Sequence, residues 1–172
     1  MAVMIVRKSS RSATQGVLQC GEFAFPCALG RGGIVSFKFE GDGGTPVGKW
    51  YFRKVFYRSD RVKRFPTGLP MAEIRDSDGW CDAPWDANYN RFVKLPYRGR
   101  SENLMRDDEL YNIIAVLSHN DSPRIHGGGS AIFVHVAKSH YQATEGCIAL
   151  KEEHLKFLLR SVNRSSYVRV VR

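Results

Sequence analysis

The sequence predicts a single, mainly β domain that carries a few short helices. Its 172 residues, of which 43% are hydrophobic and 12% aromatic, are enough to build one hydrophobic core. Apolar runs rich in β-branched and aromatic residues recur between glycine-rich breaks, which is typical of short strands joined by turns. Helical periodicity is confined to two segments. We therefore expect one domain that spans residues 1–172.

Seven segments carry the strand pattern. Residues 113–117 are apolar throughout, so we expect this strand to be covered on both faces. Alternation in the segment 49–57 predicts that Phe52 and Phe56 share one face and that Val55 lies on the other. The predicted strands are 3–6, 17–29 with a turn at Gly21 and Glu22, 34–39, 49–57, 113–117, 131–137 and 167–171.

Two helices and one long excursion complete the predicted fold. Ser101 is a candidate N-cap of a short helix that leads to Tyr111, with acidic residues in its first turns. The segment 151–162 places Leu155, Leu158 and Leu159 on one helical face. Residues 65–100 contain four prolines and have weak periodicity. We expect them to form a long ordered loop, either as a wall or lid over a groove or as a structural staple.

The net charge favours acidic partners without selecting one. The chain has 26 Lys and Arg against 17 Asp and Glu, a formal charge of +9, and the basic residues are scattered. Such a surface suits nucleic acid, an anionic envelope polymer or solvent alone. The N-terminus lacks the apolar core of a secretory signal, and no segment approaches the roughly 20 apolar residues of a membrane span.

The cysteines do not predict a metal site. None of the four has CxxC spacing or a histidine at ligand spacing, so we expect no zinc centre. Cys20 and Cys27 flank the predicted turn, which leaves a cross-strand disulfide open. Cys81 lies between Asp78 and Asp82, whose charges disfavour a thiolate, so a structural role is expected for it.

One histidine and one cysteine near the end of the chain are candidates for catalysis. His135 lies on the predicted strand 131–137, on the face that carries Phe133, and Cys147 follows twelve residues later, directly after Gly146. An imidazole within hydrogen-bond reach can take the proton of a thiol that attacks a carbonyl. The glycine leaves backbone N–H groups free to approach an oxyanion. Spacing alone does not distinguish this pair from two structural residues.

Two motifs together resemble the L,D-transpeptidase catalytic domain, the YkuD family. The first is His135 on a strand, followed by a loop and the run 144–148, Thr-Glu-Gly-Cys-Ile. The second is the glycine-rich turn 41–48, which contains Thr-Pro-Val-Gly and precedes a strand. The resemblance covers about residues 34–159. It implies a β-sandwich-like fold with short helices.

The resemblance also implies the chemistry. Cys147 corresponds to the family nucleophile, His135 to the general acid and base, and Gly146 to the backbone of the oxyanion hole. The implied reaction is a two-step acyl transfer between a donor and an acceptor stem peptide of peptidoglycan, without metal, organic cofactor or nucleic acid. If water or a free D-amino acid resolves the thioester, the enzyme is a carboxypeptidase or an exchange enzyme. The alternative of another class is a non-catalytic module that binds the cell wall.

Four residues are candidates for substrate binding, namely Thr144, Glu145, His126 and Trp80. Glu145 stands where many members have His or Lys, and its charge would raise the thiol pKa unless it points away or binds an amine of the substrate. Ala149 stands where many members have Arg or Asn. His126, like His119, lies in the loop before the His135 strand and is a candidate for the pocket lining or for a plain surface loop.

Aromatic residues of the 65–100 segment have two interpretations. They either stack on sugar rings or fill the core, and the core is the commoner outcome. The residues concerned are Trp80, Trp85, Tyr89 and Tyr97.

Location and assembly stay open at this level. The resemblance implies a role in bacterial cell wall biogenesis and cell shape, hence the cell envelope or periplasm. No signal peptide is visible, so a cytoplasmic enzyme that handles recycled wall fragments is the alternative. The oligomeric state is not indicated.

Overall fold

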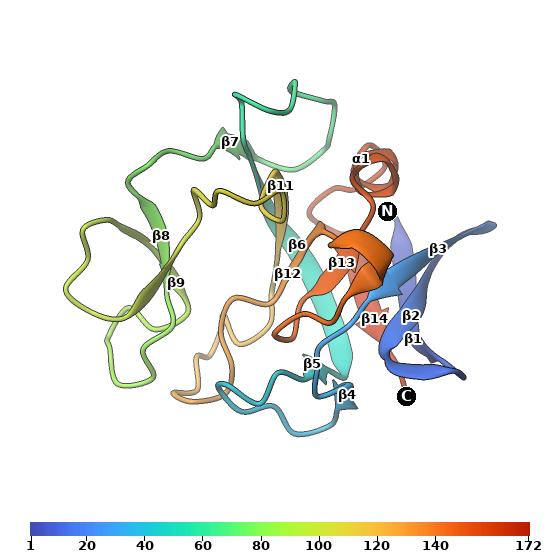
Figure 1. Cartoon of the computed structure of the whole chain (residues 1–172), viewed down its shortest axis with the longest axis horizontal. Coiled ribbons are helices and arrows are strands. Elements are labelled where there is room, and N and C mark those ends of the chain that lie inside the picture. Colours follow the sequence, from blue (N-terminus) through green and yellow to red (C-terminus); the bar gives the residue numbers. More distant parts are fainter.

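The computed structural model describes all 172 residues and confirms the mainly β prediction. It contains a single α-helix and one 3-10 turn among many short strands (Figure 1). The elements are β1 (Val3–Ser9), β2 (Ser12–Cys20), β3 (Phe23–Ala28), β4 (Ile34–Val35), β5 (Thr45–Pro46), β6 (Gly48–Tyr57), β7 (Met71–Glu73), β8 (Asp78–Cys81), β9 (Arg91–Lys94), β10 (Ser101–Asn103), β11 (Ile113–Leu117), β12 (Phe133–Val136), η1 (Ser139–Tyr141), β13 (Ile148–Leu150), α1 (Glu152–Leu159) and β14 (Tyr167–Val170).

The main sheet curls back on itself. Its nine strands follow the order β11-β12-β13-β3-β2-β1-β14-β6-β7, and β6 also pairs with β11. Most neighbours are antiparallel, whereas β1 with β14, β12 with β13 and β6 with β7 are parallel. Because β6, the strand next to last in this order, also pairs with the first strand, β11, two sides of one sheet face each other across an enclosed core.

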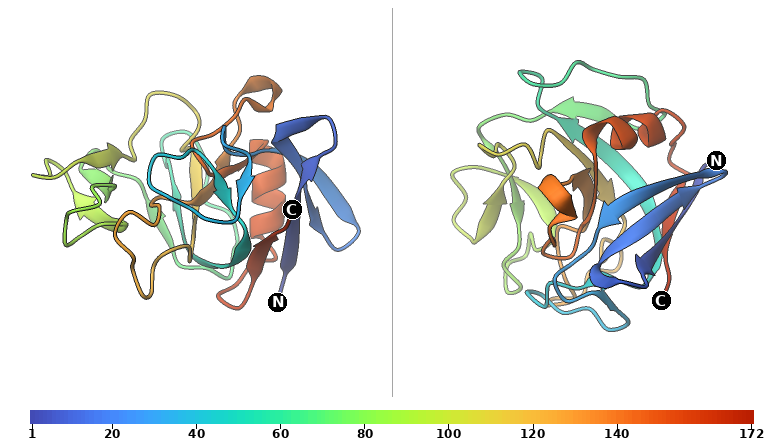
Figure 2. Two further views of the ribbon diagram at one scale, coloured as in Figure 1. Left: turned by 90° about the horizontal axis from the view of Figure 1, so that it is seen from below. Right: turned by 45° about the vertical axis from the view of Figure 1, so that its right-hand side comes forward.

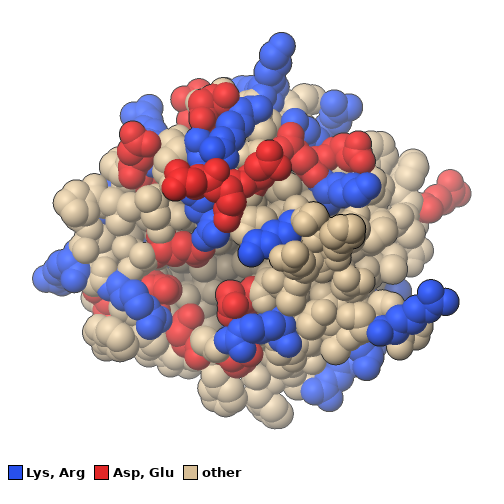
Figure 3. Space-filling view, viewed as in Figure 1, with Lys and Arg blue, Asp and Glu red and all other residues tan.

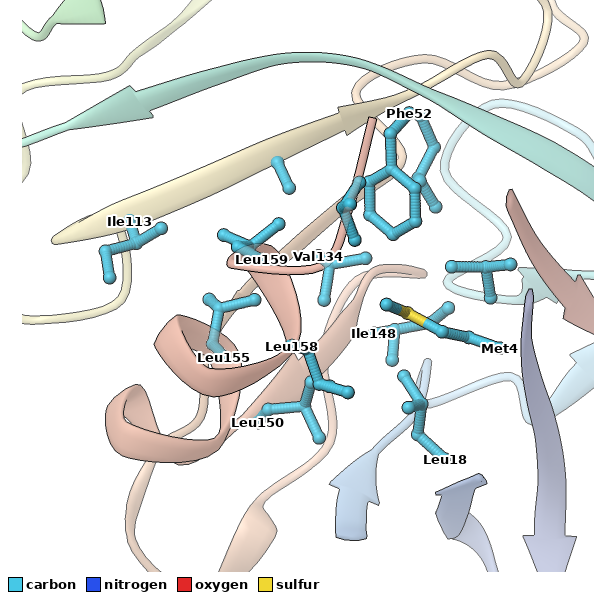
Figure 4. Close-up of a cluster of buried hydrophobic side chains, with 14 of the residues drawn as sticks. Met4, Leu18, Phe52, Ile113, Val134, Ile148, Leu150, Leu155, Leu158 and Leu159 are labelled. Carbon is cyan, nitrogen blue, oxygen red and sulfur yellow. The ribbon is translucent and has the colours of Figure 1, made fainter. Parts of the chain in front are cut away.

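The large core fills the inside of the curled sheet. It comprises 25 buried residues, and Figure 4 shows Met4, Leu18 and Ile148 converging from different strands. Helix α1 lies across one end of the sheet (Figure 2). Its buried residues are Leu155, Leu158 and Leu159, as predicted. Burial of each such side chain contributes about 1.5–3 kcal/mol, so the leucines fasten the helix to the strands.

Strand β11 separates this core from a second, smaller one. All five of its residues are buried, which confirms the prediction of a strand covered on both faces. Ile113 and Ala115 point into the large core, whereas Ile114 points into a cluster of nine residues. That cluster includes Phe133 and Cys147. Cys147, the candidate nucleophile, is therefore packed in the smaller core.

The predicted faces of β6 are wrong. Val116 of β11 is opposite Lys54, but the next residue, Leu117, is opposite Phe52, so Arg53 is an extra residue in the ladder. A bulge of this kind reverses the alternation beyond it. Phe52 consequently lies in the large core, on the side of Val55, whereas Phe56 lies in the smaller core.

The predicted helix after Ser101 is also wrong, because the segment begins with a strand. Ser101 and Asn103 of β10 pair with Cys81 and Gly79 of β8, and turns follow up to β11. Tertiary backbone pairing here outweighs the local capping signal. The 65–100 excursion contributes β8 and β9 to this three-stranded sheet β10-β8-β9, which stands beside the main sheet (Figure 1). It is therefore more regular than the long loop that the composition predicts.

The hairpin of β2 and β3 confirms the predicted turn and excludes a disulfide between Cys20 and Cys27. Gly21 has a φ of +59°, and Cys20 is opposite Phe23. Cys27 is instead opposite Gly16, four residues along β2 from Cys20, and both thiols are free. A disulfide needs closely facing Cβ atoms, which this register does not provide. The chain contains no helix with the length and apolar character that a membrane crossing requires.

Candidate active site

His135 and Cys147 come together because β12 and β13 are parallel neighbours. His135 is opposite Ile114 of β11 on one side and Ala149 of β13 on the other. Cys147 directly precedes β13. Both side chains line one pocket of about 480 Å³. In Figure 3, acidic and basic side chains rim a hollow on the face that is shown.

The Cys147 thiol is protonated and is held by backbone groups. Its Sγ donates to the carbonyl oxygen of Ala131 at 3.2 Å and accepts from the N–H of Phe133 at 3.3 Å. The residue is 7% exposed. Burial raises the pKa of the thiol to about 12, and the nearby Glu102 carboxylate acts in the same direction. A thiolate therefore does not form in the resting site at neutral pH.

The His135 imidazole is neutral and has a defined tautomer. Its Nδ1 lies 2.8 Å from the carbonyl oxygen of Val136. A carbonyl only accepts, so Nδ1 carries the proton and Nε2 keeps a lone pair. Burial lowers the pKa of His135 to about 4. The residue is thus a free base at neutral pH, with its basic nitrogen available for the pocket.

The turn before Cys147 is closed by the Thr144 side chain. Thr144 Oγ1 accepts from the N–H of Gly146 at 3.1 Å and donates to the carbonyl oxygen of Cys147 at 2.7 Å. The Gly146 N–H is therefore already engaged. The N–H of Cys147 donates to no group in the chain, which makes it the available donor for an oxyanion.

The two sequence motifs pack directly against each other. Gly146 has a φ of +127°, and a Cβ at this position would lie 2.8 Å from the carbonyl oxygen of Gly44. A Cβ at Gly30 would lie 2.0 Å from the carbonyl oxygen of Gly43. Only glycine permits these approaches. The glycine-rich turn thus supports the cysteine turn from behind.

Glu145 points toward a partner that the sequence did not indicate. Its carboxylate forms an ion pair with Arg31 at 2.8 Å, and both side chains are largely exposed. An exposed pair of this kind contributes about 0–1 kcal/mol. Glu145 still lines the pocket and raises the pKa of Cys147, although burial and Glu102 raise it more.

His126 and Trp80 lie outside the pocket of Cys147. The Nδ1 of His126 contacts the carbonyl oxygen of Pro84, and its ring stacks on Tyr89 at 5.8 Å. The Nε1 of Trp80 donates to Asn90 Oδ1 at 3.0 Å, and its ring packs edge-on against Phe133 at 5.1 Å. His126 lines a separate pocket and Trp80 supports the smaller core from behind, so neither reaches the candidate nucleophile.

Cys81 and His119 have other surroundings. Cys81 is fully buried in a small cluster with Ala83 and Val93, as expected for a structural cysteine. Burial raises its pKa. His119 is buried and lines the same separate pocket as His126.

Three residues of the pocket were missed by the sequence. The Tyr111 ring lies 5.5 Å from the His135 ring, and its hydroxyl donates to Glu102 Oε1 at 2.5 Å. Arg106 lies 3.7 Å from the same carboxylate and 5.1 Å from the Tyr111 ring centre. Burial raises the pKa of Glu102 and of Tyr111. In the sequence these residues stand in a segment of mixed charge, which is typical of an exposed helix and does not indicate a pocket.

The pocket lining is acidic although the protein is basic. Four carboxylates and two cationic side chains line it. The acids are Glu40, Asp82, Glu102 and Glu145, and the bases are Arg106 and Lys138. An excess of carboxylates favours a ligand that carries an ammonium group.

Comparison with known families agrees with the geometry. The model of the L,D-transpeptidase catalytic domain, YkuD, matches residues 3–170, a longer part of the chain than the motif-bearing stretch 34–159. No curated protein and no solved structure matches the chain in corresponding searches. Proteins with this domain are typically transpeptidases, and the family acts on peptidoglycan. The chain belongs to the family of L,D-transpeptidase catalytic domains, with a pocket that joins a neutral histidine to a protonated cysteine.

Proposed function

We propose that this protein is a cysteine acyltransferase that forms a thioester between Cys147 and a stem peptide of peptidoglycan and passes the acyl group to an amine. One observation carries the proposal. Cys147 and His135 line the same pocket, and His135 is held through Nδ1 so that Nε2 remains basic. Family membership supports L,D-transpeptidase chemistry at this site.

The first step forms the acyl-enzyme. His135 Nε2 takes the thiol proton while Sγ of Cys147 attacks the carbonyl of a diamino acid in the donor stem. The N–H of Cys147 stabilises the oxyanion. The C–N bond to D-alanine then breaks, and the leaving amine takes the proton from His135. Since proton transfer accompanies attack, no free thiolate has to exist in a buried site.

The second step transfers the acyl group. His135 accepts a proton from the side-chain amine of an acceptor stem, and this amine attacks the thioester. The new C–N bond forms, the C–S bond breaks, and the thiolate regains the proton from His135. A cross-link results, and the two steps require neither a metal nor an organic cofactor. Water or a D-amino acid in place of the acceptor amine gives carboxypeptidase or exchange activity with the same two residues.

The acidic lining supports a diamino acid as the acyl donor. Glu102 is a partly buried carboxylate whose nearest cation, Arg106, is 3.7 Å away and is also bound to Asp108 at 2.7 Å. An ammonium group of the donor stem would complete its charge balance. This argument supports a cationic substrate without selecting between transfer and hydrolysis.

Product analysis with a purified tetrapeptide stem tests the proposal. We expect a Cys147 adduct that has lost D-alanine, and a cross-linked dimer, both detected by mass spectrometry. Cys147→Ser should abolish both, as it should the covalent adduct with a carbapenem, whereas Cys20→Ser should retain them. Tripeptide or exchanged product without dimer would support the alternative activities. A binding module would be supported instead if no adduct forms and if the Cys147→Ala protein has the same effect in cells as the unchanged protein.

We further propose that the reaction takes place in the cell envelope, where the polymer lies. Fractionation of the native protein tests this location. Recovery from the envelope fraction is expected. Recovery only from the cytoplasm would indicate an enzyme that acts on recycled wall fragments.

A further inference from the structure

A second pocket, of about 530 Å³, lies outside the site of Cys147. It is an open concavity lined by the segment 36–39, by Trp50 and by residues of the loop 118–128. Three apolar side chains that line it are unusually exposed, with 82% of Phe37, 65% of Phe39 and 65% of Ile125 accessible. Exposed apolar side chains gathered around a concavity mark a binding surface.

The ionic groups of this pocket are already paired. Lys38 contacts Asp42, and Asp121 accepts from Arg53 at 2.7 Å. Serine hydroxyls and an amide supply much of the remaining polar lining, at Ser36, Ser118, Ser122 and Asn120. A strongly charged ligand would find no free counter-charge here. Ser118 already accepts from the N–H of Tyr51, and the Asn120 amide is bonded within its own loop. The hydroxyls of Ser36 and Ser122 have no partner in the chain, so a purely apolar ligand would leave them unpaired.

A buried histidine adds an unsatisfied acceptor. His119 is 7% exposed, and its Nε2 donates to the carbonyl oxygen of Gly128 at 3.0 Å. Its Nδ1 is therefore an acceptor that no group of the chain bonds to and that is sealed from solvent in this conformation. Burial lowers the pKa of His119, which keeps the ring neutral. The lining thus combines aromatic faces with neutral hydrogen-bonding groups.

The second pocket shares a wall with the catalytic pocket. Phe39 lines the second pocket and the next residue, Glu40, lines the catalytic one. On the facing segment, Gly128 lines the second pocket and Ser130 lines the catalytic one. The N–H of Glu40 donates to the carbonyl oxygen of Gly127 at 2.8 Å, which joins the two strips of backbone. A ligand that crosses this wall contacts both pockets.

We propose that the second pocket is a saccharide subsite, which binds the glycan part of a substrate whose peptide occupies the catalytic pocket. The apolar C–H face of a pyranose ring packs on Phe37 and Phe39, and its hydroxyl and acetamido groups pair with the neutral polar lining. Neutral, hydroxyl-rich rings satisfy both kinds of surface at once. The link between sugar and peptide rests on the proposed function, whereas sugar binding itself does not.

A binding experiment without turnover tests the subsite. The Cys147→Ala protein is titrated with an oligosaccharide of N-acetylglucosamine and followed by NMR chemical shifts. We expect shifts at residues of the second pocket, and a Kd that rises about tenfold when Phe37→Ala and Phe39→Ala are added. Phe23→Ala, an exposed phenylalanine far from this pocket, is the matched control and should leave the Kd unchanged.

A turnover experiment tests the link to the peptide. The ratio of kcat/KM for a disaccharide-linked stem to that for the bare stem should fall about tenfold in the Phe37→Ala, Phe39→Ala protein and stay constant in Phe23→Ala. Failure of the oligosaccharide to bind, equal loss in the control, or binding only of an apolar peptide or lipid vesicle would overturn the subsite. Oligosaccharide binding without any turnover would overturn the acyltransferase and leave the subsite standing.

Discussion

At the scale of single residues, burial sets the protonation states of the two candidate catalytic groups. Cys147 Sγ donates to a carbonyl oxygen 3.2 Å away, and His135 Nδ1 donates to another at 2.8 Å. Both groups are consequently uncharged at neutral pH, with pKa values of about 12 and about 4. The site differs in this respect from cysteine enzymes that keep a stable thiolate and imidazolium pair.

The reactivity of Cys147 should therefore rise only at high pH. Since the thiolate is the nucleophile, we expect the rate of alkylation of the free enzyme by iodoacetamide to be slower than that of a free thiol at pH 8, and to keep rising above about pH 10. Mass mapping of the labelled peptide measures it at this one cysteine. A plateau already reached near pH 7 would show that an ion pair exists and that the resting state described above is wrong.

His135 should make the fold sensitive to acid. Its pKa is lowered in the folded state from 6.5 to about 4, so the unfolded chain binds more protons between these values. Stability is then greatest above pH 6.5 and falls by about 3 kcal/mol as the pH drops to 4. Urea unfolding of His135→Gln between these pH values should show a smaller loss. His119, whose pKa is lowered too, leaves a residual slope.

The control for this measurement is His140→Asn, at an exposed residue with a φ of +55° that asparagine tolerates. It should keep the slope of the unchanged protein. Equal slopes in His135→Gln and in the unchanged protein would contradict the assignment of acid sensitivity to His135.

At residue scale, the sequence motifs identified the candidate catalytic pair. They did not identify the pocket residues that reach this pair only through the tertiary fold. Cys147 and His135 could be selected because their spacing resembles a family. Glu102 and Tyr111 could not, since their burial beside His135 depends on the pairing of Ser101 with Cys81. The mixed charges around them predict a solvent-exposed helix instead.

At the scale of elements, two glycine turns form one support for Cys147, the candidate nucleophile. Gly146→Ala should destabilise the fold by about 2–4 kcal/mol, because it combines a strained φ of +127° with a Cβ 2.8 Å from the Gly44 carbonyl oxygen. Acyl transfer should fall with it, as the Cys147 N–H moves. Thermal unfolding and adduct formation measure the two effects.

Gly21→Ala is the control for this variant, because it introduces backbone strain without a steric clash. Gly21 has a φ of +59° with nothing within 4 Å of an added Cβ, so its replacement should cost about 1 kcal/mol and leave adduct formation intact. Similar losses in both variants would contradict the close approach of the two turns.

Elements were predictable where their pattern is local. The buried strand β11 and the leucine face of α1 follow from periods within a few residues. Strand β6 was assigned correctly but its faces were not, because the bulge at Arg53 arises from register with β11. The Ser101 segment failed for the same reason, since its partner β8 lies about twenty residues earlier in the chain.

At the scale of the whole molecule, charge is mixed over the surface and its excess is positive. Figure 3 shows Lys and Arg interspersed with Asp and Glu, and the net charge is +9. We expect adsorption to isolated anionic cell walls to weaken when NaCl rises from about 0.05 M to about 0.5 M, because screening shortens the range of the attraction. Sedimentation with the walls measures it.

Turnover of a short soluble stem peptide should depend less on salt, because the charges that line a partly enclosed pocket are screened less than charges on the open surface. Wall adsorption that does not change with salt would show that the net charge has no part in it.

The position of β14 has a consequence for biosynthesis. This strand, Tyr167–Val170, lies between β1 and β6 in the main sheet, although one neighbour is the first strand of the chain. A growing polypeptide can form the β1–β2–β3 hairpins early, yet the gap between β1 and β6 stays open until β14 itself has been synthesised. The curled sheet is thus closed only after β14 has been made, later in the chain than both His135 and Cys147.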